Sequence, residues 1–151
     1  MKSWDDALST VTLIEVDSSV QPDIAIGYVD LKADLIQPDA LGFWTSWAHA
    51  GIRTRAVIKL KSEESAWFSE KHHFIHTMQH EIGNVLGLGD IAPNRHFASV
   101  LEDPWQPPYG KAALGATDIA LVKQLYGEPG TCVMKGESYL PRSQGKVASL
   151  V

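Results

Sequence analysis

Short apolar segments alternate with polar breaks along the first part of the chain, in the pattern that is typical of β-strands. Residues 11–16 (VTLIEV) and 23–29 (DIAIGYV) are short and rich in β-branched side chains, and a polar break that ends in Pro22 separates them. Residues 41–47 (LGFWTSW) indicate an edge strand, and residues 54–60 (TRAVIKL) alternate polar and apolar positions as a half-buried strand does. The sequence therefore predicts a sheet built from the first part of the chain.

Two helices are predicted in the second part of the chain. The first begins within residues 65–69, where serines can cap it, and ends near Leu86 because Gly87 is a typical helix stop. The second covers residues 118–126, with Thr117 as its expected N-cap. With the strands before them, these helices predict a mixed α and β architecture.

The first of these helices is amphipathic, because its apolar and polar side chains separate to opposite sides of a helical wheel. The apolar side carries Phe74, Met78, Ile82 and Val85. The polar side carries His73, His76, His80 and Asn84. We expect the apolar side to pack on the sheet, and the wheel alone favours a solvated surface for the polar side.

The residues that follow this polar side suggest a metal site instead. A catalytic zinc needs three protein ligands and an open position for water. Two ligands one helical turn apart, such as His80 and Asn84, share a face, and Gly87 lets the chain turn back so that Asp90 supplies a third. Glu81 can polarise the water without touching the metal. The spacing H-E-x-x-N-x-x-G-x-x-D therefore fits a hydrolytic metal centre.

This stretch resembles the metzincin signature H-E-x-x-H-x-x-G-x-x-H/D, and an aspartate as third ligand is similar to the snapalysin branch. Other segments resemble the matrixin catalytic domain in the same order: Trp4 with VTLIEV, PDIAIGYV, ALGFWTSW with RAVIKL, and DIALVKQLYG. The resemblance covers residues 4–127. It implies an α+β, zincin-like fold, in which a mixed, twisted sheet packs on the active-site helix and a C-terminal helix follows. It also implies that the family's first strand and most of its first helix, which precede the matching tryptophan, are missing here.

The resemblance also assigns functional roles. It implies that His80, Asn84 and Asp90 hold Zn²⁺, that Glu81 is the general base, and that the substrate is a protein or peptide. Gly87 stands at the turn after the helix. The activity implied is that of a zinc metalloendopeptidase.

Two residues depart from the family pattern. Asn84 replaces the second histidine ligand, and an amide oxygen is a harder and weaker ligand for zinc than an imidazole nitrogen. Leu101 stands where the family has the methionine of its Met-turn, and this apolar exchange is milder. Weak zinc binding is therefore expected. Two alternatives to a peptidase stay open: a metzincin-like pseudoenzyme or peptide-binding domain with a weakened metal site, and an interaction domain whose helix matches by chance.

Other candidate ligands are less well placed in the sequence. His76 and His80 are one turn apart and form an i, i+4 pair, but Asp90 lies too far along the helix to close that pair easily. Cys132 carries a thiol that binds zinc well when ionised, but it lies in the C-terminal region outside any matching segment. We interpret it as a free thiol.

Composition limits the classes of partner. The chain has 151 residues, which suits one domain, expected over residues 1–127 with residues 128–151 as a tail or linker. Its formal net charge of −5 argues against nucleic acid and anionic membranes as partners. No apolar run approaches the length of about 18 residues that a spanning helix needs. The N-terminal residues predict no secretion signal, and the sequence leaves compartment and oligomeric state open.

Overall fold

The computed structural model describes residues 2–9, 11–29, 41–50, 52–61, 71–92, 99–102 and 113–126. This part of the chain is mixed α+β and contains three helices and three strands. The helices are α1 (Lys2–Ala7), α2 (Lys71–Val85) and α3 (Ala116–Leu125). The strands are β1 (Ile24–Val29), β2 (Gly42–His49) and β3 (Ile52–Lys61). Three of the predicted strands and both predicted helices are therefore present.

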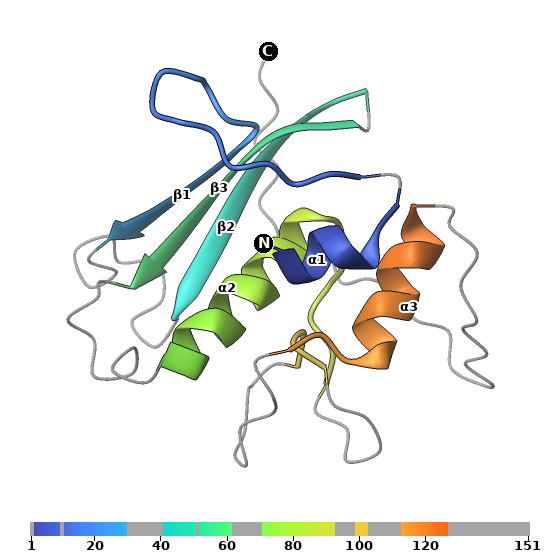
Figure 1. Ribbon diagram of the computed structural model, residues 1–151. Helices are drawn as coiled ribbons and strands as arrows, with labels where there is room; N and C mark the ends of the chain where they lie inside the picture. The colour runs from blue at the N-terminus through green and yellow to red at the C-terminus, as the bar shows by residue number, and fades with distance from the viewer. Residues whose placement is uncertain are drawn as a thin grey trace.

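The described strands form one mixed sheet in the order β1-β3-β2 (Figure 1). Strand β1 is parallel to β3, and β2 is antiparallel to β3. Strand β2 lies at an edge of this sheet, as its sequence predicts. The inner positions of β3, Ala56, Ile58 and Leu60, are almost fully buried, so one face of the sheet forms part of the core.

A β-bulge interrupts the pairing of β2 with β3. Trp47 lies opposite Arg55, whereas the next residue, Ala48, lies opposite Arg53, so Thr54 is the extra residue. Residues directly opposite each other point to the same face of a sheet, and successive residues alternate. The bulge therefore turns Arg53 to the face that packs on α2, while Arg55 stays on the other face beside Trp47.

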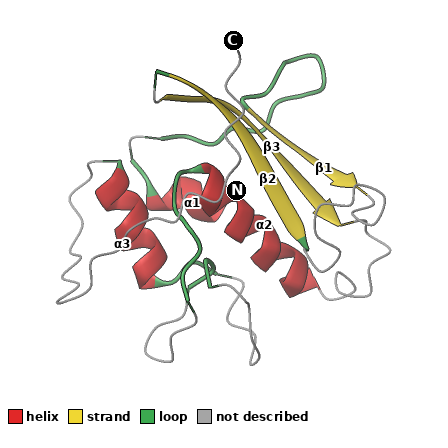
Figure 2. Ribbon diagram, turned by 180° about the vertical axis from the view of Figure 1, so that it is seen from behind, coloured by secondary structure: helices red, strands yellow, loops and turns green. Residues whose placement is uncertain are grey.

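Helix α2 lies between the sheet and the pair formed by α1 and α3 (Figure 1), and the view from behind shows the same order (Figure 2). Its apolar side packs as predicted, since Ile82 and Val85 are buried and Phe74 and Met78 pack against the core. The ring of Phe74 also stacks on Tyr28 of β1, with centroids 6.2 Å apart. This helix is therefore the central element of the described fold.

The prediction of a strand at residues 11–16 is wrong. These residues form no regular element and pair with no strand in the described part of the chain. The backbone N–H of Leu13 donates instead to the Asp5 carboxylate of α1, at 2.8 Å, and Ile14 is 72% exposed. Strand propensity reflects how well a side chain fits a pleated, half-buried surface, and it does not supply a neighbouring strand.

The helix boundaries were predicted with mixed success. Helix α2 ends within one residue of the prediction, and its predicted start within residues 65–69 lies outside the described residues. Helix α3 begins earlier than predicted, and Gly115 rather than Thr117 is its N-cap. Asp118 explains this start, because its carboxylate accepts the Gly115 N–H at 2.7 Å. The predicted tail, residues 128–151 with Cys132, lies outside the described residues.

Candidate functional site

The polar side of α2 is buried at His76 and Asn84 and half-buried at His73 and His80, so the expectation of a solvated surface is wrong. His76 and Asn84 are 3% and 6% exposed, respectively. The indole N–H of Trp4 in α1 donates to the carbonyl oxygen of Gln79 at 3.0 Å, which places α1 against this helix. A buried polar side requires specific partners, because burying a polar group without one costs free energy.

The three side chains that the sequence predicts as metal ligands contact one another here. Nε2 of His80 lies 3.1 Å from Oδ1 of Asp90, and Nδ2 of Asn84 donates to the same oxygen at 3.0 Å. We call His80, Asn84 and Asp90 the HND cluster. Nδ1 of His80 donates to the carbonyl oxygen of Val100 at 2.9 Å, which leaves Nε2 facing the carboxylate. Metal-binding histidines are commonly oriented by such a second hydrogen bond.

Proton binding and the geometry of the HND cluster are linked. Burial alone would lower the pKa of His80, but the hydrogen bond to Asp90 and the charges of Glu81 and Asp90 raise it to about 9. The hydrogen bond from His80 holds the pKa of Asp90 below its usual value. Without a bound cation, the pair is therefore an imidazolium and a carboxylate. A metal ion would have to displace this proton, since histidine binds metals in its neutral form.

Asn84 has one amide atom that remains available. Its Nδ2 is used by Asp90, whereas Oδ1 is buried and has no hydrogen-bond partner among the described residues. Such a buried oxygen is uncommon in folded proteins. Because an amide can present either its nitrogen or its oxygen after a half turn, Asn84 can donate to Asp90 or offer an oxygen ligand to a cation.

The turn after α2 brings Asp90 back to the helix. Gly87 has φ of 104°, a left-handed conformation that favours glycine. The N–H of Leu88 donates to the Gly83 carbonyl, and the N–H of Gly87 donates to the Asn84 carbonyl, both at 3.0 Å. These two bonds form a Schellman motif. The predicted role of Gly87 at the turn is thus seen in its backbone.

Leu101 packs against α2, the helix that carries His80 and Asn84 of the HND cluster. It is fully buried, and a methyl group added at Gly83 would lie 2.7 Å from its Cδ2 and 2.9 Å from Cζ2 of Trp4. Its carbonyl accepts the N–H of Ile91 at 2.9 Å, so the chain just after Asp90 is fixed to this segment. The segment at residues 99–102 therefore packs against α2 and fixes the chain next to Asp90.

Asp118 holds this segment in place, a role that no sequence pattern indicates directly. Its buried carboxylate accepts the hydroxyl of Ser99, the N–H of Val100 at 3.1 Å and the N–H of Gly115 at 2.7 Å. Because Val100 also accepts from His80, Asp118 helps to orient the imidazole. The only local signal is an acidic residue in the first turn of a helix, which usually indicates a cap.

Glu81 lies between α2 and the start of β2. It is 5% exposed, and a methyl group added at Gly42 would lie 2.9 Å from its Oε1. The missing side chain at Gly42 therefore leaves the room that the carboxylate occupies. Sequence reasoning did not single out Gly42, because the contact joins residues far apart in the chain.

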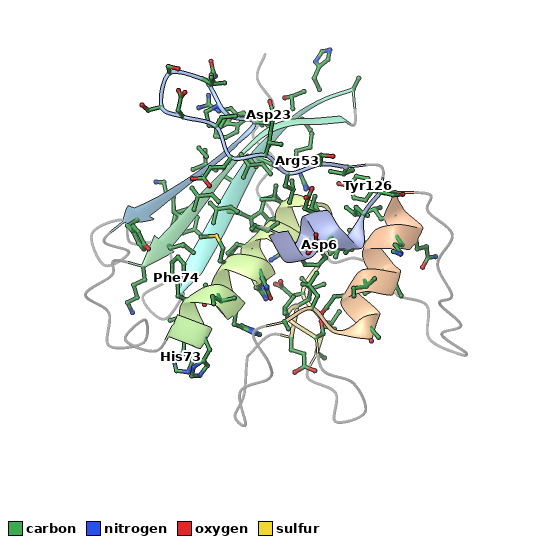
Figure 3. All side chains as sticks on the ribbon, in the orientation of Figure 1. Asp6, Asp23, Arg53, His73, Phe74 and Tyr126 are labelled. Carbon is green, nitrogen blue, oxygen red and sulfur yellow. The ribbon has the colours of Figure 1, made fainter. Side chains whose placement is uncertain are left out.

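Two further residues from other elements reach the C-terminal end of α2 (Figure 3). Arg53 of β3 donates to the carbonyl of Val85, and also to that of Asn84 at 3.2 Å. The hydroxyl of Tyr126, which follows α3, donates to the carbonyl of Leu86 at 2.9 Å. Sequence reasoning missed both residues, since nothing in their local sequence indicates these contacts.

The donor set of the HND cluster fits zinc with one weak ligand. An imidazole and a carboxylate are ordinary zinc ligands, whereas an amide oxygen is a poor one. Within the described residues, no group of three or more His, Cys, Asp or Glu side chains is placed to hold a metal ion. Among the described residues, a third donor to a metal held by His80 and Asp90 would have to be the amide of Asn84. His76, the alternative partner of His80, belongs to no such group.

Comparisons of the chain with protein-family models, curated proteins and solved structures found no match. The functional argument therefore depends on the geometry and chemistry of the cluster. In the described part of the chain, no helix is both long and apolar enough to cross a membrane.

Proposed function

We propose that this chain is a zinc-dependent metallopeptidase of the metzincin kind. His80, Asn84 and Asp90 would hold the metal, and Glu81 would serve as general base. The observation that carries the proposal is the meeting of His80 and Asn84 on one carboxylate oxygen of Asp90, at 3.1 and 3.0 Å. Ligand atoms around a tetrahedral zinc, with bonds of about 2.0–2.1 Å, lie about 3.3 Å apart, so His80 and Asp90 need only small shifts. Asn84 must also turn its amide so that Oδ1 takes the place of Nδ2.

The arrangement of the elements supports the same proposal. A mixed sheet packs on the helix that carries the cluster, and an antiparallel strand, β2, lies at the edge next to Glu81. An edge strand can pair with an extended peptide through backbone hydrogen bonds. A zincin-like fold, with β2 beside the substrate, is therefore part of the proposal.

Each residue of the site has a defined task in this chemistry. Bound zinc would act as a Lewis acid that makes a water molecule nucleophilic near neutral pH. His80 would bind zinc through Nε2 in its neutral form, and the Val100 carbonyl holds its Nδ1–H in place. Glu81, held beside Gly42, accepts a proton from the water and can return it to the leaving amine.

A second candidate function is a pseudoenzyme that binds peptides. The same contacts give it a specific basis, because Asp90 accepts hydrogen bonds from both His80 and Nδ2 of Asn84 without any cation. Because an amide oxygen is a weak ligand for zinc, the metal-free state is favoured further. Metal binding and hydrolysis must therefore be measured separately.

The test uses protein purified without a metal-affinity resin. Zinc binding is measured by calorimetric titration, and hydrolysis is measured on casein, for the wild type and for Glu81→Gln. We expect both proteins to bind one zinc ion, and the variant to lose about 10²–10⁴-fold in hydrolysis. Zinc binding without hydrolysis by the wild type would favour the pseudoenzyme. Absence of zinc binding at millimolar metal would refute the proposed function.

A further inference from the structure

The last turn of α2 is unusual in how its carbonyl groups are satisfied. The final carbonyls of a helix have no partner within the helix, and a Schellman turn satisfies only some of them. Here the carbonyls of Asn84 and Val85 accept from Arg53, and that of Leu86 accepts from Tyr126. Residues from two other elements therefore fix the turn that carries one member of the HND cluster.

Arg53 is well suited to this position. The bulge at Thr54 turns it to the inner face of the sheet, and its guanidinium lies 4.8 Å from the ring centroid of Trp44, a cation–π contact. Both hydrogen bonds come from one terminal nitrogen, Nη1, whose two hydrogens can reach two neighbouring carbonyls at once. Its positive charge also suits the negative end of the helix dipole. Bulges are frequently found next to active sites, where they redirect a side chain.

We propose that Arg53 is a positioning residue for the HND cluster. It fixes the carbonyls of Asn84 and Val85, and so sets the distance between the Asn84 amide and Asp90. The Asn84 carbonyl also accepts the N–H of Gly87, so the same contact steadies the turn that returns the chain to Asp90. This inference rests on the proposed function for its effect on metal binding, and it predicts a structural effect that needs no metal.

Arg55 offers a matched control. It lies on the same strand two residues away, and its guanidinium is 5.7 Å from the ring centroid of Trp47. It points to the other face of the sheet, away from α2. Arg53→Met and Arg55→Met therefore remove the same charge and the same kind of aromatic contact, but only the first removes the helix contacts. Arg53→Lys keeps the charge but replaces the planar, fixed guanidinium by a flexible ammonium group.

The first arm measures metal binding by zinc titration and by the absorption spectrum of the Co²⁺-substituted protein. We expect Arg53→Met to weaken zinc binding by about 10–100-fold, as the loss of groups that orient ligands does. The Co²⁺ spectrum should change in that variant. Arg55→Met should match the wild type, and Arg53→Lys should recover part of the affinity. Equal zinc affinity for Arg53→Met and Arg55→Met would overturn the inference and leave the proposed function intact.

The second arm uses the metal-free protein and nuclear magnetic resonance. We expect Arg53→Met to shift the side-chain amide signals of Asn84 and to speed hydrogen exchange at Gly87 and Leu88 by at least about tenfold, because the end of the helix opens locally. Exchange at Val122, which is fully buried in α3, serves as an internal reference for global stability. If the wild type binds no zinc, the proposed function fails, and this arm still decides the role of Arg53. Unchanged Asn84 signals and exchange would refute it.

Discussion

At the scale of single residues, Asn84 is the weakest ligand of the proposed metal site. Replacing it by histidine would complete a set of two histidines and one aspartate with room for water. We expect Asn84→His to raise zinc affinity by at least about 10–100-fold, since outer-shell changes alone cause effects of this size. Calorimetric titration measures the affinity, and cleavage of casein should rise in parallel.

The double variant Asn84→His/Glu81→Ala is the control for this prediction. It should keep the gain in zinc affinity and lose the hydrolysis, because the water loses its base. If the wild type already binds zinc tightly and cleaves casein, the amide is a competent ligand and the prediction is wrong. If the histidine variant still binds no zinc, Asp90 is too firmly held by its present partners.

His76 should make the fold sensitive to mild acid. Burial, with smaller contributions from His80 and His73, lowers the pKa of His76 from 6.5 to about 4, so the folded state holds it neutral. The unfolded chain then binds the extra proton between these values, and stability falls as pH drops from about 6.5 to about 4. At about 1.4 kcal/mol for each pKa unit, the loss is at most about 3.5 kcal/mol.

Urea unfolding of the wild type and of His76→Leu at pH 7 and pH 4.5 measures this effect. The variant should lose less stability between the two pH values than the wild type does. His49→Leu is a matched control at an exposed position at the end of β2. An equal pH dependence for His76→Leu and the wild type would contradict the prediction.

At the scale of elements, the contact between α2 and β2 depends on a glycine. An alanine at position 42 would place its methyl 2.9 Å from Oε1 of Glu81 and 3.1 Å from Cδ2 of Leu60. We expect Gly42→Ala to displace Glu81 and to cost about 1–3 kcal/mol of stability, as overpacking does. Casein hydrolysis should fall while zinc affinity stays unchanged, because Glu81 is not a ligand.

Gly27 in β1 provides the control, because a methyl group there would meet nothing within 4 Å. Gly27→Ala should be neutral or stabilise by up to about 1 kcal/mol, through a smaller loss of backbone entropy. Chemical unfolding and the hydrolysis assay on both variants give the comparison. Equal behaviour of the two alanine variants would show that Glu81 does not need the space at Gly42.

At the scale of the whole molecule, local patterns predicted most of the described elements and few of the contacts between them. Periodicity located three strands and the apolar side of α2, because burial on one face sets the period of the sequence. The end of α2 followed from Gly87, whose positive φ is a local requirement. Residues 11–16 have the composition of a strand, but pairing needs a neighbour that no local pattern reveals.

The candidate site divides in the same way. The spacing of residues in the sequence predicts the HND cluster, because its members lie on one helix and the turn after it. No local pattern predicts the roles of Arg53, Asp118 and Gly42, since each contacts a segment that is distant in the chain. Long-range contacts also explain why the polar side of α2 is buried rather than solvated. Whether the cluster binds zinc stays a prediction.

Zinc binding should be visible in the stability of the whole domain. A ligand that binds only the folded state at 100 times its Kd stabilises by about 2.7 kcal/mol. For a domain of this size, that corresponds to an increase in Tm of about 5–10 °C. We expect this increase in the wild type, its reversal by a chelator, and its absence in His80→Ala. The matched variant His49→Ala should respond to zinc as the wild type does. If neither zinc nor any other divalent ion at millimolar concentration changes the Tm of the wild type, the His80–Asp90 pair is a closed structural contact. The peptide-binding pseudoenzyme would then be the better interpretation.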